Sequence, residues 1–180
     1  MAQIATKSGL DSLLKNDFSY ASKYEIELTF PTGISATKDM LLRCDSVSIP
    51  GRNLRTVGDF NIYGPPVEVV QGLTFGEIST TFYLSPDLRE RRIMELWQDT
   101  IIDPTTFDLG YYDDYVGSLK VFTLDKRDVR TSGYELREAY PKSIDVISLG
   151  HSSSNTLNKL SVSFQYRYWS RIQLVTEPGL

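Results

Sequence analysis

The sequence has little of the chemistry that most active sites need. Its 180 residues include one cysteine, Cys44, and one histidine, His151. A single cysteine excludes an intrachain disulfide and a CxxC metal site, and a single histidine removes most metal and acid–base constellations. Neither GxGxxG nor GxxxxGK[ST] occurs, so no phosphate-binding loop is predicted. We therefore predict no enzyme activity, no cofactor and no metal site.

An excess of positive charge is also missing. Lysine and arginine number 19 against 23 acidic residues, a net charge of −4 with a pI near 5.0. This excludes a protein that grips nucleic acid through a dominant basic surface, because phosphate contacts need clustered Lys and Arg. No apolar run approaches the roughly 18 residues that span a bilayer, and the N-terminus lacks a signal-peptide pattern. We expect a protein made in a cytoplasm, without a membrane partner.

The few reactive residues have ordinary structural interpretations. His151 lies in the polar stretch GHSSSN, which is typical of a turn and rarely holds a Ser/His pair in attack geometry. Cys44 falls in a predicted strand, where a buried, inert thiol is expected. Asp113 and Asp114 lack the spacing of a calcium loop, so we interpret them as solvated charges.

What the sequence does have is alternation of apolar and polar residues, the pattern of β-strands. The predicted strands are Lys23–Phe30, Met40–Ile49, Glu77–Ser85, Tyr115–Asp125, Tyr134–Leu149 and Leu160–Trp169. The last is the clearest, because apolar residues from Leu160 onward alternate strictly with Ser161, Ser163 and Gln165. Such a strand meets a different environment on each face.

One helix is predicted at about 86–102. Ser85 is the candidate N-cap, Pro86 the first helical residue, and Asp103-Pro104 ends the pattern. Its apolar positions are Leu88, Ile93, Leu96, Trp97 and Ile101, and its predicted solvated side is Arg89, Glu90, Arg91, Arg92 and Glu95. The spacing of Leu10, Leu13, Leu14 and Phe18 also suggests a short N-terminal helix at about 9–18, with a mobile terminus as the alternative.

Strands, one helix and further strands predict a mostly β (α+β) fold in a single domain, residues 1–180. Residues at about 52–72 contain few apolar side chains and the sequence Gly64-Pro65-Pro66, so we predict a long projecting β-hairpin arm. Residues 103–114 mix acidic and aromatic side chains in a long loop, which we interpret as a candidate interaction surface.

The order of these features resembles the tail tube proteins of contractile-tailed bacteriophages (the myovirus tail tube) and their relatives in contractile injection systems. Trp97 lies at the family's helix tryptophan, and residues 170–180 form a C-terminal extension beyond the resemblance, which covers about 10–170. The matching segments are LDSLLKNDFSYASKYEIEL, RCDSVSIPGRNL, FGEISTTFYLSPDLRERRIMELWQD and YPKSIDVISLGHSSSNTLNKLSVSFQYRYW.

The resemblance implies a β-sandwich or barrel-like subunit with one flanking α-helix. Such subunits assemble into hexameric rings, which stack into the hollow conduit of a virion tail for DNA delivery. The implied partners are further copies of the chain, tail sheath and baseplate proteins, and DNA or a tape-measure protein that passes through without specific binding. A tube-initiator or baseplate tube-like protein, or the inner tube protein of a contractile injection system, is an alternative within the family. From another class, Tyr111, Tyr112 and Tyr115 suggest the aromatic platform of a carbohydrate-binding sandwich.

Two groups of residues follow as hypotheses. The arm would bury its side chains between subunits or rings through Arg52, Leu54, Arg55, Val57, Phe60, Ile62, Tyr63, Pro65, Pro66 and Val69. The lumen would be lined by Glu77, Ser79, Thr81, Ser161, Ser163 and Gln165. A wall that lets DNA slide should not hold phosphates, so we expect Arg167 to pair with a carboxylate or to lie beyond the lumen.

Overall fold

Two packed layers of antiparallel strands make up the body of the protein. The computed structural model describes residues 19–34, 38–59, 63–150 and 156–174. Sheet A contains β1 (Tyr24–Thr29), β6 (Gly117–Leu124), the first part of β7 (Arg130–Ile144) and β9 (Tyr168–Ile172). Sheet B contains the second part of β7, then β8 (Lys159–Gln165), β5 (Ile78–Tyr83) and β2 (Cys44–Val47). The mostly β prediction is confirmed.

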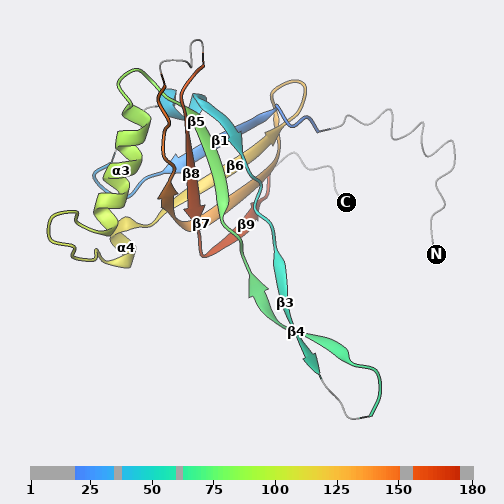
Figure 1. The fold of residues 1–180 in the computed structure, drawn as a ribbon. Helices are drawn as coiled ribbons and strands as arrows, with labels where there is room; N and C mark the ends of the chain where they lie inside the picture. The colour runs from blue at the N-terminus through green and yellow to red at the C-terminus, as the bar shows by residue number, and fades with distance from the viewer. Residues whose placement is uncertain (1–18, 35–37, 60–62, 151–155, 175–180) are drawn as a thin grey trace.

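Strand β7 belongs to both sheets and joins them without a loop. It bends at Glu138, whose φ of 54° lies in the left-handed region, and the pairing register with β6 shifts at the same point. Strands β8 and β9 run back beside β7, one in each sheet, with Tyr166 and Arg167 between them. One long bent hairpin therefore connects the two layers (Figure 1).

The core between the sheets is centred on Trp97, which is fully buried. Its indole N–H donates to the Tyr115 carbonyl at 2.7 Å, and its ring lies 4.9 Å from that of Phe30 and 5.9 Å from that of Phe164. Gly117 has to be a glycine, because a Cβ there would lie 2.2 Å from the Thr29 carbonyl oxygen and 2.8 Å from the indole. The other core side chains come mainly from both sheets and α3, and α2 contributes Met40.

The main helix, α3 (Arg89–Ile101), begins later than predicted. Residues 85–88 form a turn closed by the Leu88 N–H on the Ser85 carbonyl, and Leu88 has a φ of 50°. Ser85 and Pro86 are therefore not the N-cap and the first helical residue. Leu88 and Leu96 are exposed, while Ile93, Met94 and Trp97 face the core.

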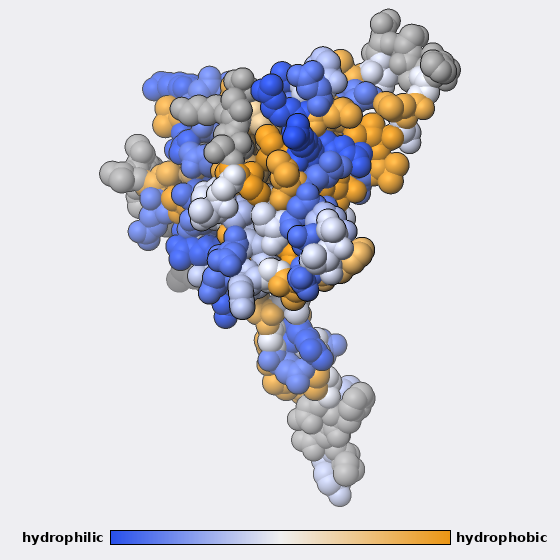
Figure 2. Space-filling view, turned by 90° about the vertical axis from the view of Figure 1, so that its left-hand side faces the viewer, coloured by the Kyte–Doolittle hydropathy of each residue, from blue (hydrophilic) through white to orange (hydrophobic). Residues whose placement is uncertain are grey.

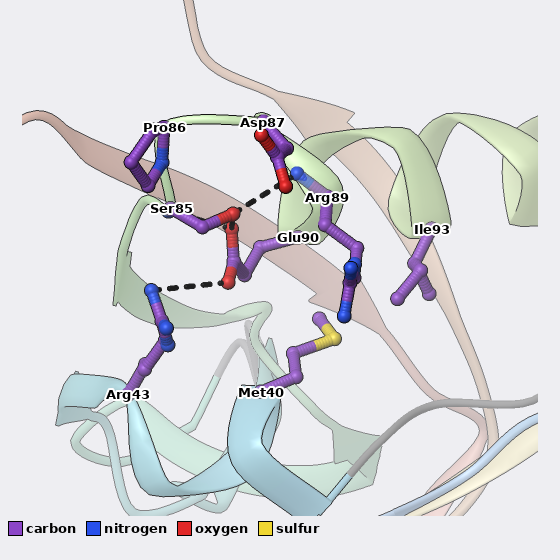
Figure 3. Close-up of a pocket in the computed structure, with 8 residues that line it drawn as sticks. All are labelled: Met40, Arg43, Ser85, Pro86, Asp87, Arg89, Glu90 and Ile93. Carbon is purple, nitrogen blue, oxygen red and sulfur yellow. Dashed lines mark hydrogen bonds and ion pairs between the residues drawn. The ribbon is translucent and has the colours of Figure 1, made fainter.

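Glu90 is also not on the solvated side of α3, because it is 3 % exposed. One carboxylate oxygen accepts from the backbone N–H and the hydroxyl of Ser85, both at 2.8 Å, and the other lies 3.6 Å from the Arg43 guanidinium. These groups line a small pocket of about 180 Å³ (Figure 3). Glu90 thus links the start of α3 to Ser85 in the preceding turn and to Arg43 beside β2.

Replacing Glu90 by alanine is expected to destabilise the fold by about 1–3 kcal/mol, because the partly buried Ser85 donors lose their acceptor. Burial raises the pKa of Glu90, but its hydrogen bonds with Ser85 and the charge of Arg43 hold that pKa below its ordinary value. The stabilisation is therefore present above the unfolded-state pKa and is lost as the pH falls through the folded-state pKa.

Urea unfolding at several pH values measures this effect. The matched control is Glu95→Ala, which removes an exposed pair with Arg91 at 2.6 Å and should cost at most about 0.5 kcal/mol. Equal losses for the two variants would contradict the structural role of Glu90.

Several predicted strands have different boundaries. The segment Met40–Ile49 starts as a helix, α2 (Lys38–Leu42), because its Met-Leu-Leu run favours helix and buries Met40. Tyr115 ends a short helix, α4 (Tyr112–Tyr115), so β6 begins two residues later. The strand predicted at Tyr134–Leu149 starts at Arg130 and ends at Ile144, and Leu160–Trp169 is interrupted where β8 gives way to β9.

Some predictions lie outside the described residues, namely the N-terminal helix at 9–18, the turn at His151, and the arm residues Phe60 and Ile62. Residues 170–172 of the predicted extension belong to β9. In the part of the chain that the structure describes, no helix is long and apolar enough to span a membrane. The same residues contain no group of three or more His, Cys, Asp or Glu side chains suited to a metal ion.

Candidate functional site

The arm is a two-stranded hairpin that projects from the body (Figure 1). Strands β3 (Asn53–Asp59) and β4 (Val67–Thr74) pair only with each other among the described strands. At the base, the Trp169 indole donates to the Gly51 carbonyl at 3.0 Å, and the Arg52 guanidinium lies 4.6 Å from the indole ring centroid. The arm is anchored at its root and has no packing partner further out within the described chain.

Both faces of the arm carry exposed aliphatic side chains. Val57 and Val69 are opposite each other on one face, and Leu54 and Leu73 on the other. Leu54 and Val57 alternate to opposite faces of β3, and the register shift after Arg55 brings Leu73 opposite Leu54. The exposed fractions run from 45 % to 60 % for Leu54, Val57, Val67, Val69, Val70 and Leu73. Figure 2 shows hydrophobic side chains at the surface of the arm. The other predicted arm residues that the structure describes, Arg52, Arg55, Tyr63, Pro65 and Pro66, are exposed as well.

The predicted lumen residues lie together on the solvent face of sheet B. Strands β5 and β8 turn alternate side chains into the core, which leaves Ser79 opposite Ser163 and Thr81 opposite Ser161. The hydroxyl oxygens of Thr81 and Ser161 are 3.5 Å apart. Gln165 occupies the next outward position of β8, and Glu77, just before β5, pairs with Lys142.

Sequence reasoning missed further members of this face. Ser46 lies opposite Thr81, and Ser143 lies opposite Ser163. The signal was present in Ser143-Ile144-Asp145, where a polar residue stands on each side of a half-buried isoleucine. We call the group Ser46, Ser79, Thr81, Ser143, Ser161 and Ser163 the hydroxyl face.

The outward face of sheet A has a different character. Arg130 binds Glu25 at 2.8 Å and Glu27 at 2.6 Å, and Glu135 lies 3.0 Å from Arg137 and 3.9 Å from Lys120. Charged side chains of both signs therefore cross this sheet, whereas small hydroxyl groups occupy the middle of sheet B. The two outer surfaces of the sandwich suit different neighbours.

Arg167 pairs with a carboxylate, as predicted. Its guanidinium lies 3.1 Å from both carboxylate oxygens of Glu138, at the bend of β7. The Tyr112 hydroxyl donates to the same carboxylate at 2.9 Å. Burial, followed by this hydrogen bond, raises the pKa of Tyr112 to about 12, so the phenol stays protonated at neutral pH. Arg167 is thus neutralised within the subunit.

The acidic loop after α3 is held in shape by hydrogen bonds among its own residues, including the Asp103 side chain. The Asp103 carboxylate accepts from the N–H groups of Thr105 at 2.7 Å and Thr106 at 3.2 Å, and Ile102 forms a bridge with Leu109. It presents large side chains to solvent, with Phe107, Leu109 and Tyr111 each more than 70 % exposed.

The three tyrosines of the carbohydrate-module hypothesis do not form one platform. Tyr115 is half-buried and stands edge-on to Tyr112, at 5.4 Å, and to Tyr140, at 5.8 Å. Sugar rings stack on exposed flat aromatic faces, so this arrangement does not favour that function.

Cys44 shows no sign of activation. Burial raises the pKa of its thiol to about 11, so the thiolate is scarce at neutral pH. A sequence model of phage tail tube proteins matches residues 19–172.

The chain belongs to the phage tail tube protein family. As a tail tube protein, it is a structural component of a tail. The tube and tail resemblance stated from the sequence is therefore confirmed. No curated protein matches the sequence.

Solved structures show the same fold in contractile machines. A chain in the structure of the anti-feeding prophage cap, which terminates the tube, aligns with a TM-score of 0.67 and 11 % identity over 96 % of this chain and 97 % of its own. A chain of the PVC sheath–tube complex, an extracellular contractile injection system, has a TM-score of 0.65 and 10 % identity, and the match covers 95 % of this chain and 100 % of that one. A chain of the sixfold-symmetrised anti-feeding prophage baseplate has a TM-score of 0.61 and 10 % identity, and the match covers 87 % of this chain and 97 % of that one. At these identities the likeness concerns the fold alone.

Proposed function

We propose that this tail tube protein forms hexameric rings that stack into a hollow conduit, and that the hydroxyl face lines its lumen. The observation that carries the proposal is the contrast between the two outer surfaces of the sandwich. A passing DNA chain would be held by fixed cations, because they bind phosphates with release of counterions. Small neutral hydroxyls offer it no such contact, and they occupy the middle of sheet B.

Free strand edges supply a way to close the ring. In sheet B, β2 pairs only with β5, and the second part of β7 pairs only with β8 among the described strands. Joining the β2 edge of one copy to the β7 edge of the next continues the sheet around the axis. A closed barrel removes both edges, which otherwise invite aggregation. A head-to-tail contact of this kind closes by rotation.

The arm supplies contacts between copies. An isolated two-stranded hairpin is marginal in water, and this one exposes aliphatic side chains on both faces. Covering it with neighbouring subunits or rings buries those side chains. At roughly 25 cal/mol per Å² of apolar surface, such burial makes a substantial contribution to association.

Other parts of the machine are proposed as partners, and the virion as the location. The structural relatives include chains of a sheath–tube complex and of a baseplate, which supports sheath and baseplate proteins as neighbours of this tube. DNA or a tape-measure protein would be the cargo. A tube-initiator or baseplate role, or an inner tube of an injection system, is the alternative, since cap, baseplate and tube chains share the fold.

Negative-stain electron microscopy of the purified protein tests the proposal. We expect sixfold rings that stack into hollow tubes. A protein that stops at single rings would support the initiator role instead. A well-behaved monomer at high concentration would contradict the assembly proposal.

A further inference from the structure

Two lysines interrupt the neutral character of the sheet B surface, and each is matched by a carboxylate. We propose that Asp45 and Glu77 neutralise the wall of the conduit by holding the ammonium groups of Lys159 and Lys142. This inference rests on the proposed lumen, and it assigns to four charged side chains the task of keeping a polyanion from sticking.

The first pair lies at one end of the hydroxyl face. The Lys159 ammonium is 2.8 Å from the Asp45 carboxylate and 4.9 Å from the Tyr83 ring centroid. Lys159 is opposite Tyr83 across β8 and β5, and Asp45 reaches them from a register shift in β2. The hydrogen bond with Lys159 holds the pKa of Asp45 below its usual range, and the same bond raises the pKa of Lys159. Both groups therefore stay charged and paired at neutral pH.

The second pair lies at the other end. Lys142 occupies a register shift of β7 between Pro141 and Ser143, and its ammonium pairs with the Glu77 carboxylate beside β5. The side chains are 54 % and 41 % exposed. Lys142 therefore reaches across β8 to a carboxylate two strands away.

The charge balance of this surface shows what the pairs accomplish. Among the described residues on or directly beside its strands, two lysines, Lys142 and Lys159, stand against three acidic residues, Asp45, Glu77 and Asp145, and each lysine pairs with one of them. Exposed ion pairs contribute little to folding, typically about 0–1 kcal/mol, so stability alone does not account for a carboxylate at both lysines. An unpaired lysine repeated in every subunit would give the lumen a ring of phosphate-binding charges.

The test removes the two carboxylate charges that pair with the lysines and keeps the shape of the side chains; we call the resulting protein the unmasked variant. In dispersed subunits, Asp45→Asn with Glu77→Gln is expected to raise the affinity for a fluorescent double-stranded DNA at low salt by at least about fivefold, with a steeper salt dependence. The matched control adds Lys142→Gln and Lys159→Gln and should return the affinity to the wild-type value. Fluorescence anisotropy against salt concentration measures both. Unchanged affinity in the unmasked variant would overturn the neutralising role.

Microscopy and infection separate this inference from the proposed function. If neither wild type nor variant forms tubes, the assembly proposal fails, while the binding measurement still reports on the charge pairs. In a phage that carries the unmasked variant, we expect normal tails and slower DNA release, restored by the control. Tighter DNA binding together with unchanged release would show that this surface does not line the lumen.

Discussion

A chain in which Leu54 to Val69 are replaced by a short Asn-Gly turn is expected to fold and form rings, but to form no tubes. The body should survive, because β3 and β4 pair only with each other among the described strands and their side chains lie outside the core. Stacking should be lost, because the arm is the proposed contact between copies. Electron microscopy measures the length of the assemblies, and thermal unfolding confirms that the subunit is folded.

Two matched variants ask whether both faces of the arm are needed. Val57→Ser with Val69→Ser alters one face, and Leu54→Ser with Leu73→Ser alters the other, while the hairpin itself is kept. Each is expected to shorten or abolish the tubes, because each exposed aliphatic pair needs a covering surface. Stacked tubes from the armless chain would refute the role of the arm. Normal tubes from one face variant would show that only the opposite face is covered.

Two lysines in the middle of the hydroxyl face are expected to block the conduit. Ser161→Lys with Ser163→Lys should permit assembly, because both positions are on the outward side of β8. Infectivity should fall at least about tenfold, because every subunit adds two phosphate-binding charges to the wall. Plaque counts and a DNA-release assay on purified virions provide the measurement.

The control keeps the added length and removes the charge. Ser161→Gln with Ser163→Gln should assemble and infect close to the wild-type level, which separates charge from steric obstruction. Full infectivity of the lysine variant, with tubes present in the virion, would remove both serines from the lumen.

Much of sheet B could be predicted because its signal is local. Alternation in β5 and β8 assigns one face to the core and one to solvent, and the pairing of Ser79 with Ser163 follows once the strands meet. The helix tryptophan and the projecting arm were also visible as local patterns. Trp97, predicted at an apolar position of the helix, is indeed buried, and it packs against both sheets.

The features that sequence reasoning missed depend on contacts between distant residues. Glu90 looks like a surface charge until Ser85 and Arg43 are brought to it. Lys142 and Glu77 come together only when β8 pairs with both β7 and β5, the strands in or beside which they lie. The bend at Glu138 has no local marker, since residues other than glycine rarely adopt a positive φ. Long-range pairing determines each of them.

The pairing of the strands also sets the order in which a new chain can fold. The arm closes within a short stretch, from Asn53 to Thr74, but Tyr24 pairs with Thr123 and Ile78 with Phe164. At about 5–20 residues per second of translation, β1 waits about 5–20 seconds for its partner. Sheet B is completed only when β8 has left the ribosome. Both strands of the arm are therefore synthesised well before the pairing of the body can be completed.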